Sequence, residues 1–168
     1  MLELGVKFLI SYFIGSLMGA RIVGKLRGGV DIRTMGSGNA GGTNALRTQG
    51  RLFALGVILI DVGKSVLATT WVAHATIFGA AVGGPSPLWV ALGCGAAAVI
   101  GHCYPLFFGF RGGKGMATLL GAYAVLAPPV LIVVVIIGIL AAIAAPKFMN
   151  ISADARDNAA ANVLGDAV

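Results

Sequence analysis

Apolar runs alternate with short polar or glycine-rich stretches along most of this chain. The runs cover residues 4–20, 52–73, 88–101, 116–127 and 130–145, and a proline pair at 128–129 separates the last two. Residues 4–20 would reach about 26 Å as a helix, near the thickness of a bilayer core. The pattern predicts an all-α, polytopic integral membrane helical bundle, with a break at the proline pair.

Composition supports a membrane protein and charge predicts its orientation. The chain is 58% hydrophobic and 11% charged, against about 45–50% and about 25% in soluble domains. Six of its cations and one acid, Asp31, lie in residues 21–51. By the positive-inside rule this stretch is cytoplasmic and the N-terminus outside. Positive residues follow the first run, which argues against a signal peptide, and they lie between apolar spans, which argues against nucleic-acid binding.

Residues 36–47, GSGNAGGTNALR, form a stretch dense in hydrogen-bond donors. Its glycines match a dinucleotide-binding pattern, but no preceding strand or later acidic residue supports that interpretation. We expect a flexible loop in which Ser37, Asn39, Thr43 and Asn44 orient an oxyanion and Arg47 binds it bidentately. A disordered glycine-rich linker is the alternative.

A second glycine-rich stretch, GHCYPLFFGFRGGKGMAT, covers residues 101–118. We expect its glycines to turn backbone N–H groups toward one point, where Arg111 and Lys114 add positive charge and so favour a phosphate. The alternative is a basic turn between two membrane helices, anchored by aromatic residues. The charge rule places both stretches on the cytoplasmic face, which predicts one shared anion site.

Charged residues also occur inside two apolar runs. Asp61 and Lys64 share a helix face at i, i+3 and can pair. A charge at this depth indicates a functional site by default, although a structural ion pair is an equal alternative. We expect Lys7 to extend toward the membrane surface. Cys94 and Cys103 fall in no metal-ligand pattern, so we expect no metal.

Three segments together, GSGNAGGTNALR, the DVGK at residues 61–64 and GHCYPLFFGFRGGKGMAT, resemble one family. It is the bacterial acyl-phosphate:glycerol-3-phosphate acyltransferase (PlsY) family, and the resemblance covers residues 4–127. It implies acyl transfer from acyl phosphate to the 1-hydroxyl of glycerol 3-phosphate in phospholipid synthesis at the bacterial inner membrane, without a cofactor. By position it implies catalytic roles for Ser37, His102 and Lys114. It implies substrate binding by Asn39, Gly41, Thr43, Asn44, Arg47, Arg111, Gly112, Gly113, Gly115 and Thr118, with Asp61 and Lys64 as a supporting pair.

The implied chemistry needs no enzyme nucleophile, because acyl phosphate is already activated. Holding both phosphates and placing the hydroxyl beside the carbonyl can supply about 7–11 kcal/mol. Ser37 or Asn39 can donate to the developing oxyanion. His102 is a candidate base, or a donor that orients a phosphate, and the leaving phosphate can equally accept the proton.

The last part of the chain departs from that family. Residues 130–168 lack its basic C-terminal motif, R-H-x-x-N-I-x-R, and resemble the N-terminal helix of type IV pilin-like proteins. We therefore expect two parts, an incomplete acyltransferase-like domain at 1–129 and an apolar helix with a polar tail at 130–168, as in a truncated or chimeric product. The rival functions are an inactive remnant that still binds phosphate and a structural membrane subunit. A homo-oligomer is compatible with either.

Overall fold

The computed structural model describes residues 1–79, 86–141, 143, 144 and 146. Contacts divide the chain into two compact units, Met1–Pro128 and Pro129–Val168, and each is treated by itself. An apolar helix, Pro128–Ala141, begins at the proline pair, where the sequence predicted a break. The polar tail at 147–168 lies outside the described residues, so its pilin-like interpretation stays a prediction.

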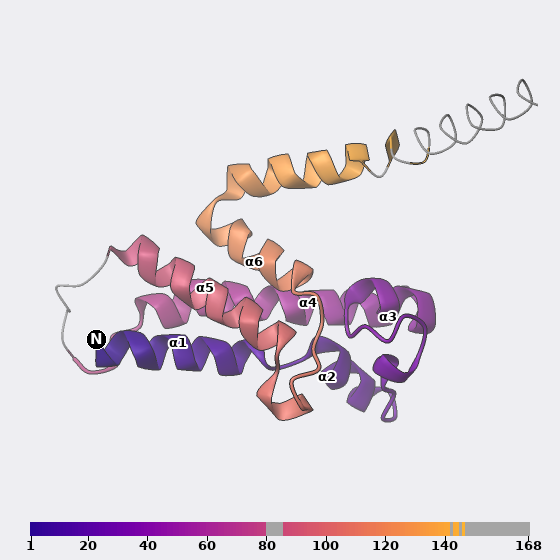
Figure 1. Ribbon diagram of the computed structural model, residues 1–168, viewed down its shortest axis with the longest axis horizontal. Helices are drawn as coiled ribbons and strands as arrows, with labels where there is room; N and C mark the ends of the chain where they lie inside the picture. Colours follow the sequence, from indigo (N-terminus) through magenta and orange to yellow (C-terminus); the bar gives the residue numbers. More distant parts are fainter. Residues whose placement is uncertain (80–85, 142, 145, 147–168) are drawn as a thin grey trace, which may run out of the picture. The chain divides into compact units, whose positions relative to one another are not determined.

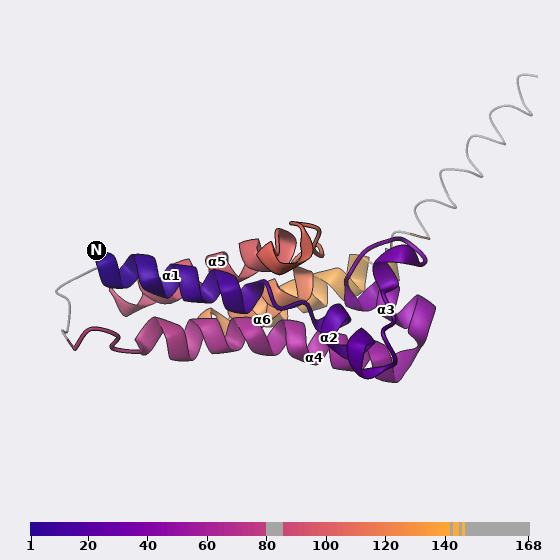
Figure 2. The ribbon, with the colours of Figure 1, turned by 90° about the horizontal axis from the view of Figure 1, so that it is seen from below.

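The regular secondary structure of the first unit is all helical in its described residues, as predicted. Figures 1 and 2 show long helices running in alternating directions, with α2 and α3 gathered at the end opposite the N-terminus. In chain order the elements are α1 (Leu2–Gly15), α2 (Gly19–Leu26), η1 (Ile32–Thr34), α3 (Gly42–Gln49), α4 (Arg51–Leu67), η2 (Ala68–Val72), α5 (Pro87–Cys103), η3 (Leu106–Phe108) and α6 (Met116–Leu126).

The lengths and composition of three segments are those of membrane spans. Arg51–Val72 and Pro87–Phe108 are long and apolar enough to cross a bilayer, and α1 with α2 forms a third such segment bent by 44°. One unbroken helix over residues 4–20 was predicted, and this is wrong. The helix ends at Gly15 and resumes at Gly19. The carbonyl of Leu17 accepts from Lys64, and the N–H of Gly19 donates to Asp61. Polar partners from α4 thus satisfy backbone groups freed by the break.

Glycines bring the helices together at backbone distance. A Cβ added to Gly15 or Gly101 would run into backbone of the facing helix, at Ala98 in α5 and at Tyr12 in α1 respectively. Gly121 of α6 lies equally close to Val62 of α4. Such contacts are typical of membrane helices, which gain packing where small residues let backbones approach.

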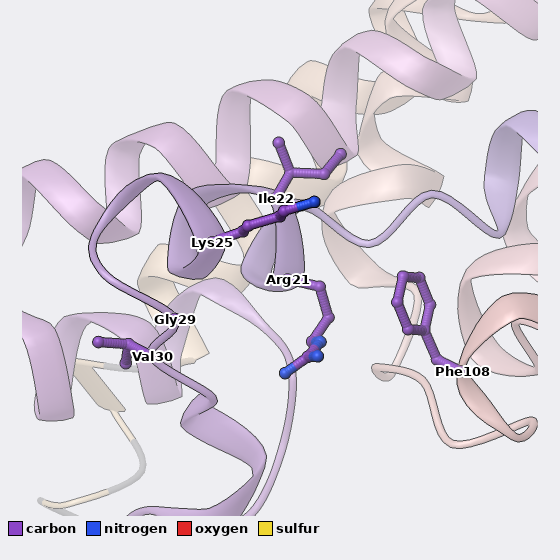
Figure 3. Close-up of a pocket in the computed structure, with 6 residues that line it drawn as sticks. All are labelled: Arg21, Ile22, Lys25, Gly29, Val30 and Phe108. Atoms are coloured by element: carbon purple, nitrogen blue, oxygen red, sulfur yellow. The ribbon is translucent and has the colours of Figure 1, made fainter.

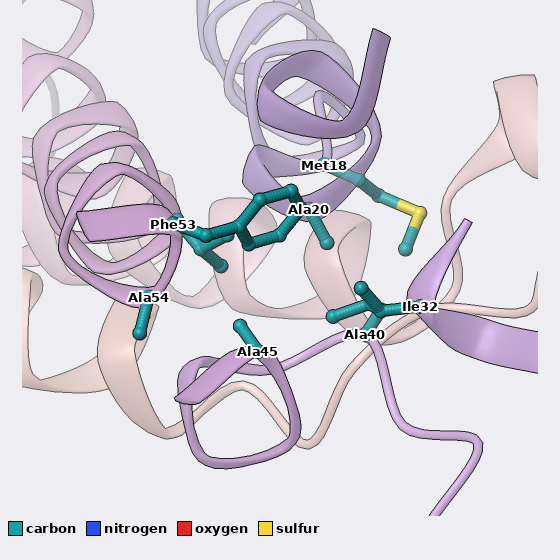
Figure 4. Close-up of a cluster of buried hydrophobic side chains, with 8 residues drawn as sticks. Met18, Ala20, Ile32, Ala40, Ala45, Phe53 and Ala54 are labelled. Carbon is teal, nitrogen blue, oxygen red and sulfur yellow. The ribbon is translucent and has the colours of Figure 1, made fainter. Parts of the chain in front are cut away.

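The stretch between residues 21 and 51 is more ordered than expected. A flexible loop was predicted at residues 36–47, yet part of it forms α3. A buried apolar cluster holds α2, η1, α3 and α4 together (Figure 4); it comprises Met18, Ala20, Ile32, Ala40, Ala45, Phe53, Ala54 and Val57. This packing supplies the stability that a short glycine-rich helix lacks alone.

Lys7 does not extend to the membrane surface as expected. Its ammonium group pairs with Glu3 at 3.2 Å and donates to the carbonyl of Ala73 at 3.0 Å. The pair ties α1 to the end of η2, and α1 packs mainly against α5.

Candidate functional site

The two glycine-rich stretches meet at one cavity of about 450 Å³, as the sequence predicted. The cavity is lined from four parts of the chain: the segment before α3 with α3 itself, the middle of α4, the end of α5 and the start of α6. Its walls comprise Ser37, Asn39, Gly41, Gly42, Thr43, Asn44, Arg47, Ile58, Asp61, Val62, His102, Lys114, Gly115, Met116, Ala117 and Leu120. Most predicted site residues are therefore neighbours in space.

The buried amide of Asn44 shapes the first stretch. Its oxygen accepts from the N–H of Ser37 at 3.0 Å, and its nitrogen donates to the carbonyls of Ile32, Met35 and Asn39 at 2.9, 3.1 and 2.9 Å. Asn44 is only 2% exposed. Because its donors and its acceptor are already used, we assign Asn44 to holding Ser37 and Asn39 in place, and no longer to binding phosphate directly.

Backbone hydrogen bonds fix the second stretch in a different way. The N–H groups of Gly112 and Gly113 donate to the carbonyls of Cys103 and His102, both at 3.2 Å. The expectation that these glycines offer free N–H groups to an anion is therefore wrong. The bonds instead fold the segment back against the end of α5, and Gly115 then turns with φ +76° to start α6.

Two helix N-termini replace the expected nest of glycine N–H groups. Gly42 and Thr43 open α3, Met116 and Ala117 open α6, and all four line the cavity. The first turn of a helix leaves N–H groups without intrahelical partners and carries positive partial charge. Arg47 and Lys114 add full charges to the same walls. The sequence analysis missed Gly42, Met116 and Ala117, which follow Gly41 and Gly115 and open the two helices.

A buried polar cluster lies at the inner end of the cavity. The ammonium of Lys64 lies 3.0 Å from Asp61 Oδ1 and 2.8 Å from His102 Nδ1, and His102 Nδ1 lies 3.4 Å from Asp61 Oδ1. The predicted pairing of Asp61 with Lys64 is confirmed. The inclusion of His102 was not predicted, since 38 residues separate it from Lys64 and local spacing carries no such signal.

Five predicted residues do not line this cavity, and one of them is Lys64 of the buried cluster. Thr118 is fully buried in the first turn of α6, and Gly113 lies against the edge of the His102 ring. Arg111 and Gly112 border a separate hollow of about 560 Å³ with Asp31 and Arg33. A hydrogen bond from the Arg33 guanidinium holds the pKa of Asp31 below its usual value.

A third hollow, of about 490 Å³, lies beside α2, and Figure 3 shows the residues that line it. Arg21 and Lys25 of α2, with Ile22, face Gly29, Val30 and Phe108 across it. The Arg21 guanidinium pairs with Asp31 at 2.7 Å and lies 5.8 Å from the centre of the Phe108 ring. Arg21 is therefore engaged apart from the cavity that holds Arg47 and Lys114.

Metal ligands are not gathered in the part of the chain that the structure covers. Among the described residues there is no group of three or more His, Cys, Asp or Glu side chains placed to hold a metal ion. The walls of the cavity supply N–H groups and cations, which suit an anion instead.

Known proteins with similar sequences point to one family. A glycerol-3-phosphate acyltransferase of Bacillus cereus strain G9842 is 42% identical over 130 residues, covering 77% of this chain and 61% of that protein. A protein of the same name from Escherichia coli O1:K1 is 46% identical over 116 residues, covering 69% of this chain and 52% of its own length. This chain thus spans about three fifths of the length of the first of these relatives.

Two solved structures of a glycerol 3-phosphate acyltransferase are also similar to this chain. The glycerol 3-phosphate form of PlsY, described as an integral membrane glycerol 3-phosphate acyltransferase, aligns with a TM-score of 0.60 and 34% identity. Its lysophosphatidic acid form aligns with a TM-score of 0.60 and 32% identity. Each alignment covers 77% of this chain and about three fifths of the other.

The family model described as glycerol-3-phosphate acyltransferase matches residues 6–153. The match continues beyond residue 127, into the segment that also resembles a pilin-like helix. Together with the relatives in sequence and structure, it shows that this chain is a membrane protein and belongs to the glycerol-3-phosphate acyltransferase family.

Proposed function

We propose that this chain transfers an acyl group from acyl phosphate to the 1-hydroxyl of glycerol 3-phosphate. The observation that carries the proposal is the meeting of two helix N-termini with Arg47 and Lys114 at one cavity. Both substrates are phosphate esters or anhydrides, and each needs a positively charged cradle. Two such cradles side by side can place the hydroxyl beside the acyl carbonyl.

The reaction then needs positioning more than covalent participation. The glycerol oxygen attacks the acyl carbon, the carbonyl oxygen takes up negative charge, and the carbon–oxygen bond to phosphate breaks. The hydroxyl proton goes to the departing phosphate or to a base. Ser37 and Asn39 line the cavity where they can donate to the developing oxyanion, while Lys114 stabilises the phosphate that leaves.

The acyl chain needs an apolar surface near this cavity. A groove of about 320 Å³ between α5 and α6 offers one, lined by Leu92, Gly95, Ala96, Val99, Ile100, Leu119, Ala122, Tyr123 and Leu126. We expect it to hold part of the donor chain. Ala96→Phe, which fills the groove, should then raise the half-saturating concentration of palmitoyl phosphate more than that of a short-chain acyl phosphate; an equal effect on both would remove the groove from the site.

Orientation in the inner membrane follows from charge. The cations of residues 21–51 and those of residues 111–114 belong to the end of the bundle that holds the cavity, and the N-terminus lies at the other end (Figure 1). The positive-inside rule places the cavity at the cytoplasm and the N-terminus outside. Cysteine labelling of Ser37→Cys from one side of sealed vesicles tests this; labelling from the periplasmic side alone would contradict it.

The decisive experiment measures phosphate release from palmitoyl phosphate by the purified chain, with and without glycerol 3-phosphate. We expect release that depends on glycerol 3-phosphate and is lost in Lys114→Ala. Lys25→Ala, which removes a cation from the hollow beside α2, is the matched control and should retain activity. Release by the unaltered chain no higher than by Lys114→Ala would refute the enzyme proposal.

Binding measurements separate the remaining candidates. The second candidate is a protein that binds phosphate without turnover, because Arg47, Lys114 and the helix N-termini at the cavity would serve binding alone as well. Retained glycerol 3-phosphate binding without phosphate release would support it, and loss of both would favour a structural subunit. Arg47→Ala should raise the glycerol 3-phosphate concentration needed for half-saturation by about tenfold or more, the loss expected for hydrogen bonds to a charged group.

A further inference from the structure

Lys64 has a full set of hydrogen-bond partners inside the bundle. An ammonium group has three N–H donors. Three acceptors surround Nζ: the carbonyl of Leu17 at 2.8 Å, Asp61 Oδ1 at 3.0 Å and His102 Nδ1 at 2.8 Å. Because the side chain is only 4% exposed, water does not compete for these positions.

This arrangement decides which nitrogen of His102 carries the proton. A nitrogen that accepts from an ammonium cannot carry a hydrogen of its own, so the neutral ring must be protonated at Nε2. The alternative is an Nδ1–H that donates to Asp61. The distances favour the first arrangement, because Nδ1 lies 2.8 Å from Lys64 and 3.4 Å from Asp61.

The side chain of His102 borders the substrate cavity, and its Nε2 is the nitrogen that neither Lys64 nor Asp61 engages. His102 is one of the cavity's lining residues, and Nε2 lies so close to Gly113 that a Cβ there would collide with it. Nε2 has no hydrogen-bond partner among the residues that the structure describes. An Nε2–H donor is therefore left without a protein partner on a ring that lines the cavity where the proposed function puts a phosphate.

We propose that Lys64 is a positioning residue that fixes His102 as an Nε2–H donor to a substrate phosphate, and so prevents it from acting as a general base. The proposal rests on the proposed function for the identity of the anion. It assigns to the interior Asp61–Lys64 pair a task that ion pairing alone does not explain. Asp61 balances the charge of Lys64, Lys64 orients the ring, and the ring contacts the substrate.

Nitrogen-15 NMR of histidine-labelled protein in lipid nanodiscs tests the tautomer directly and needs no catalysis. The chain has two histidines, so in the His74→Gln protein every histidine signal comes from His102. His74 is exposed and bonded to Thr70 at the end of η2, so this background should behave as the unaltered protein. We expect a protonated Nε2 and an unprotonated Nδ1, and a change in the Nε2–H signal when glycerol 3-phosphate is added.

Variants of Lys64 then test the cause. Lys64→Met removes the donors and should shift His102 toward the Nδ1–H form that donates to Asp61, with a loss of about 10- to 100-fold in kcat/KM, as for one hydrogen bond to a charged group. Lys64→Gln keeps one neutral donor and should restore part of the Nε2–H form and of the activity.

Several results would overturn the proposal. An Nδ1–H tautomer in the His74→Gln protein would overturn it even if Lys64→Met failed to fold. An Nε2–H signal indifferent to glycerol 3-phosphate would overturn the donor role. If the tautomer and the substrate response are as expected while no phosphate is released, the proposed catalytic function fails and the role of Lys64 stands.

Discussion

Two buried lysine–carboxylate pairs lie in the first unit, and they differ in one partner. Glu3 with Lys7 and Asp61 with Lys64 are each about one helical turn apart, and each lysine also donates to a carbonyl of a neighbouring segment, that of Ala73 or Leu17. Only the second pair contacts an imidazole, that of His102.

The difference shows that burial of a charge does not by itself identify a functional site. Both pairs satisfy backbone groups where a helix ends, which is a structural task in an apolar bundle. The Glu3–Lys7 pair does no more than this in the described residues. The Asp61–Lys64 pair also meets a ring that lines the cavity, and that contact links it to the proposed substrate site.

Removing the lysine from each pair should give the largest losses in the free energy of unfolding. Lys64→Met leaves Asp61, 1% exposed, as a buried charge without its ammonium and should lower the free energy of unfolding by about 3–5 kcal/mol. Lys7→Met should cost about 1–3 kcal/mol, because the side chains of Lys7 and Glu3, 11% and 9% exposed, are less deeply buried than those of Lys64 and Asp61. Reversible unfolding in SDS measures both. Equal losses would mean that the two environments are energetically alike.

Removing both members of each pair should separate stability from activity. Asp61→Leu with Lys64→Met should regain part of the stability, yet kcat/KM should stay about 10- to 100-fold low, since His102 loses its orienting partner. Glu3→Leu with Lys7→Met should leave kcat/KM unchanged. Phosphate-release kinetics on both double variants give the comparison, which fails if the Glu3–Lys7 variant loses activity to the same extent.

A methyl group beside the His102 ring tests the same link from its other side. Gly113→Ala places a Cβ against Nε2 and should lower kcat/KM by about tenfold, the low end of the loss for one displaced hydrogen bond. Gly63→Ala is the matched control, since its Cβ meets nothing within 4 Å and should stabilise α4 by about 0.5–1 kcal/mol. Normal activity in Gly113→Ala would show that the ring can move freely.

The sequence predicted the features that depend on local spacing or on net charge. The i, i+3 spacing of Asp61 and Lys64 was enough to predict that they pair. The charge rule was enough to predict that Ser37 and Lys114 lie on the same face. The sequence did not predict features that depend on contacts between residues far apart in the chain. The apolar pattern runs on through Leu17, so nothing local marks a break whose backbone groups are satisfied by α4.

The glycine-rich stretches show the same limit. Gly112 and Gly113 look free in the sequence, but they donate to carbonyls about ten residues earlier. Asn44 looks like a ligand, but its amide is consumed by three carbonyls and the N–H of Ser37. In both cases the glycines and amides predicted that the stretch lines a polar site. Tertiary contacts decide which of its hydrogen-bonding groups remain free for a ligand.

A third ion cluster, at the surface, should show the smallest effect. Asp31 pairs with Arg21 at 2.7 Å and with Arg33 at 2.9 Å, and its side chain is 24% exposed. The hydrogen bond from Arg33, with the charges of both arginines, lowers the pKa of Asp31.

A carboxylate with a lowered pKa in the folded state contributes stability above its unfolded pKa of about 3.9, and this contribution is lost as the pH falls through the folded value. Asp31→Asn should therefore reduce the free energy of unfolding by about 0–1 kcal/mol at neutral pH, and the difference should shrink as the pH falls through the lowered pKa of Asp31. Unfolding measured between pH 3 and pH 7 checks this. A loss as large as that of Lys64→Met, or one that grows in acid, would mean that exposure does not separate this cluster from the buried pairs.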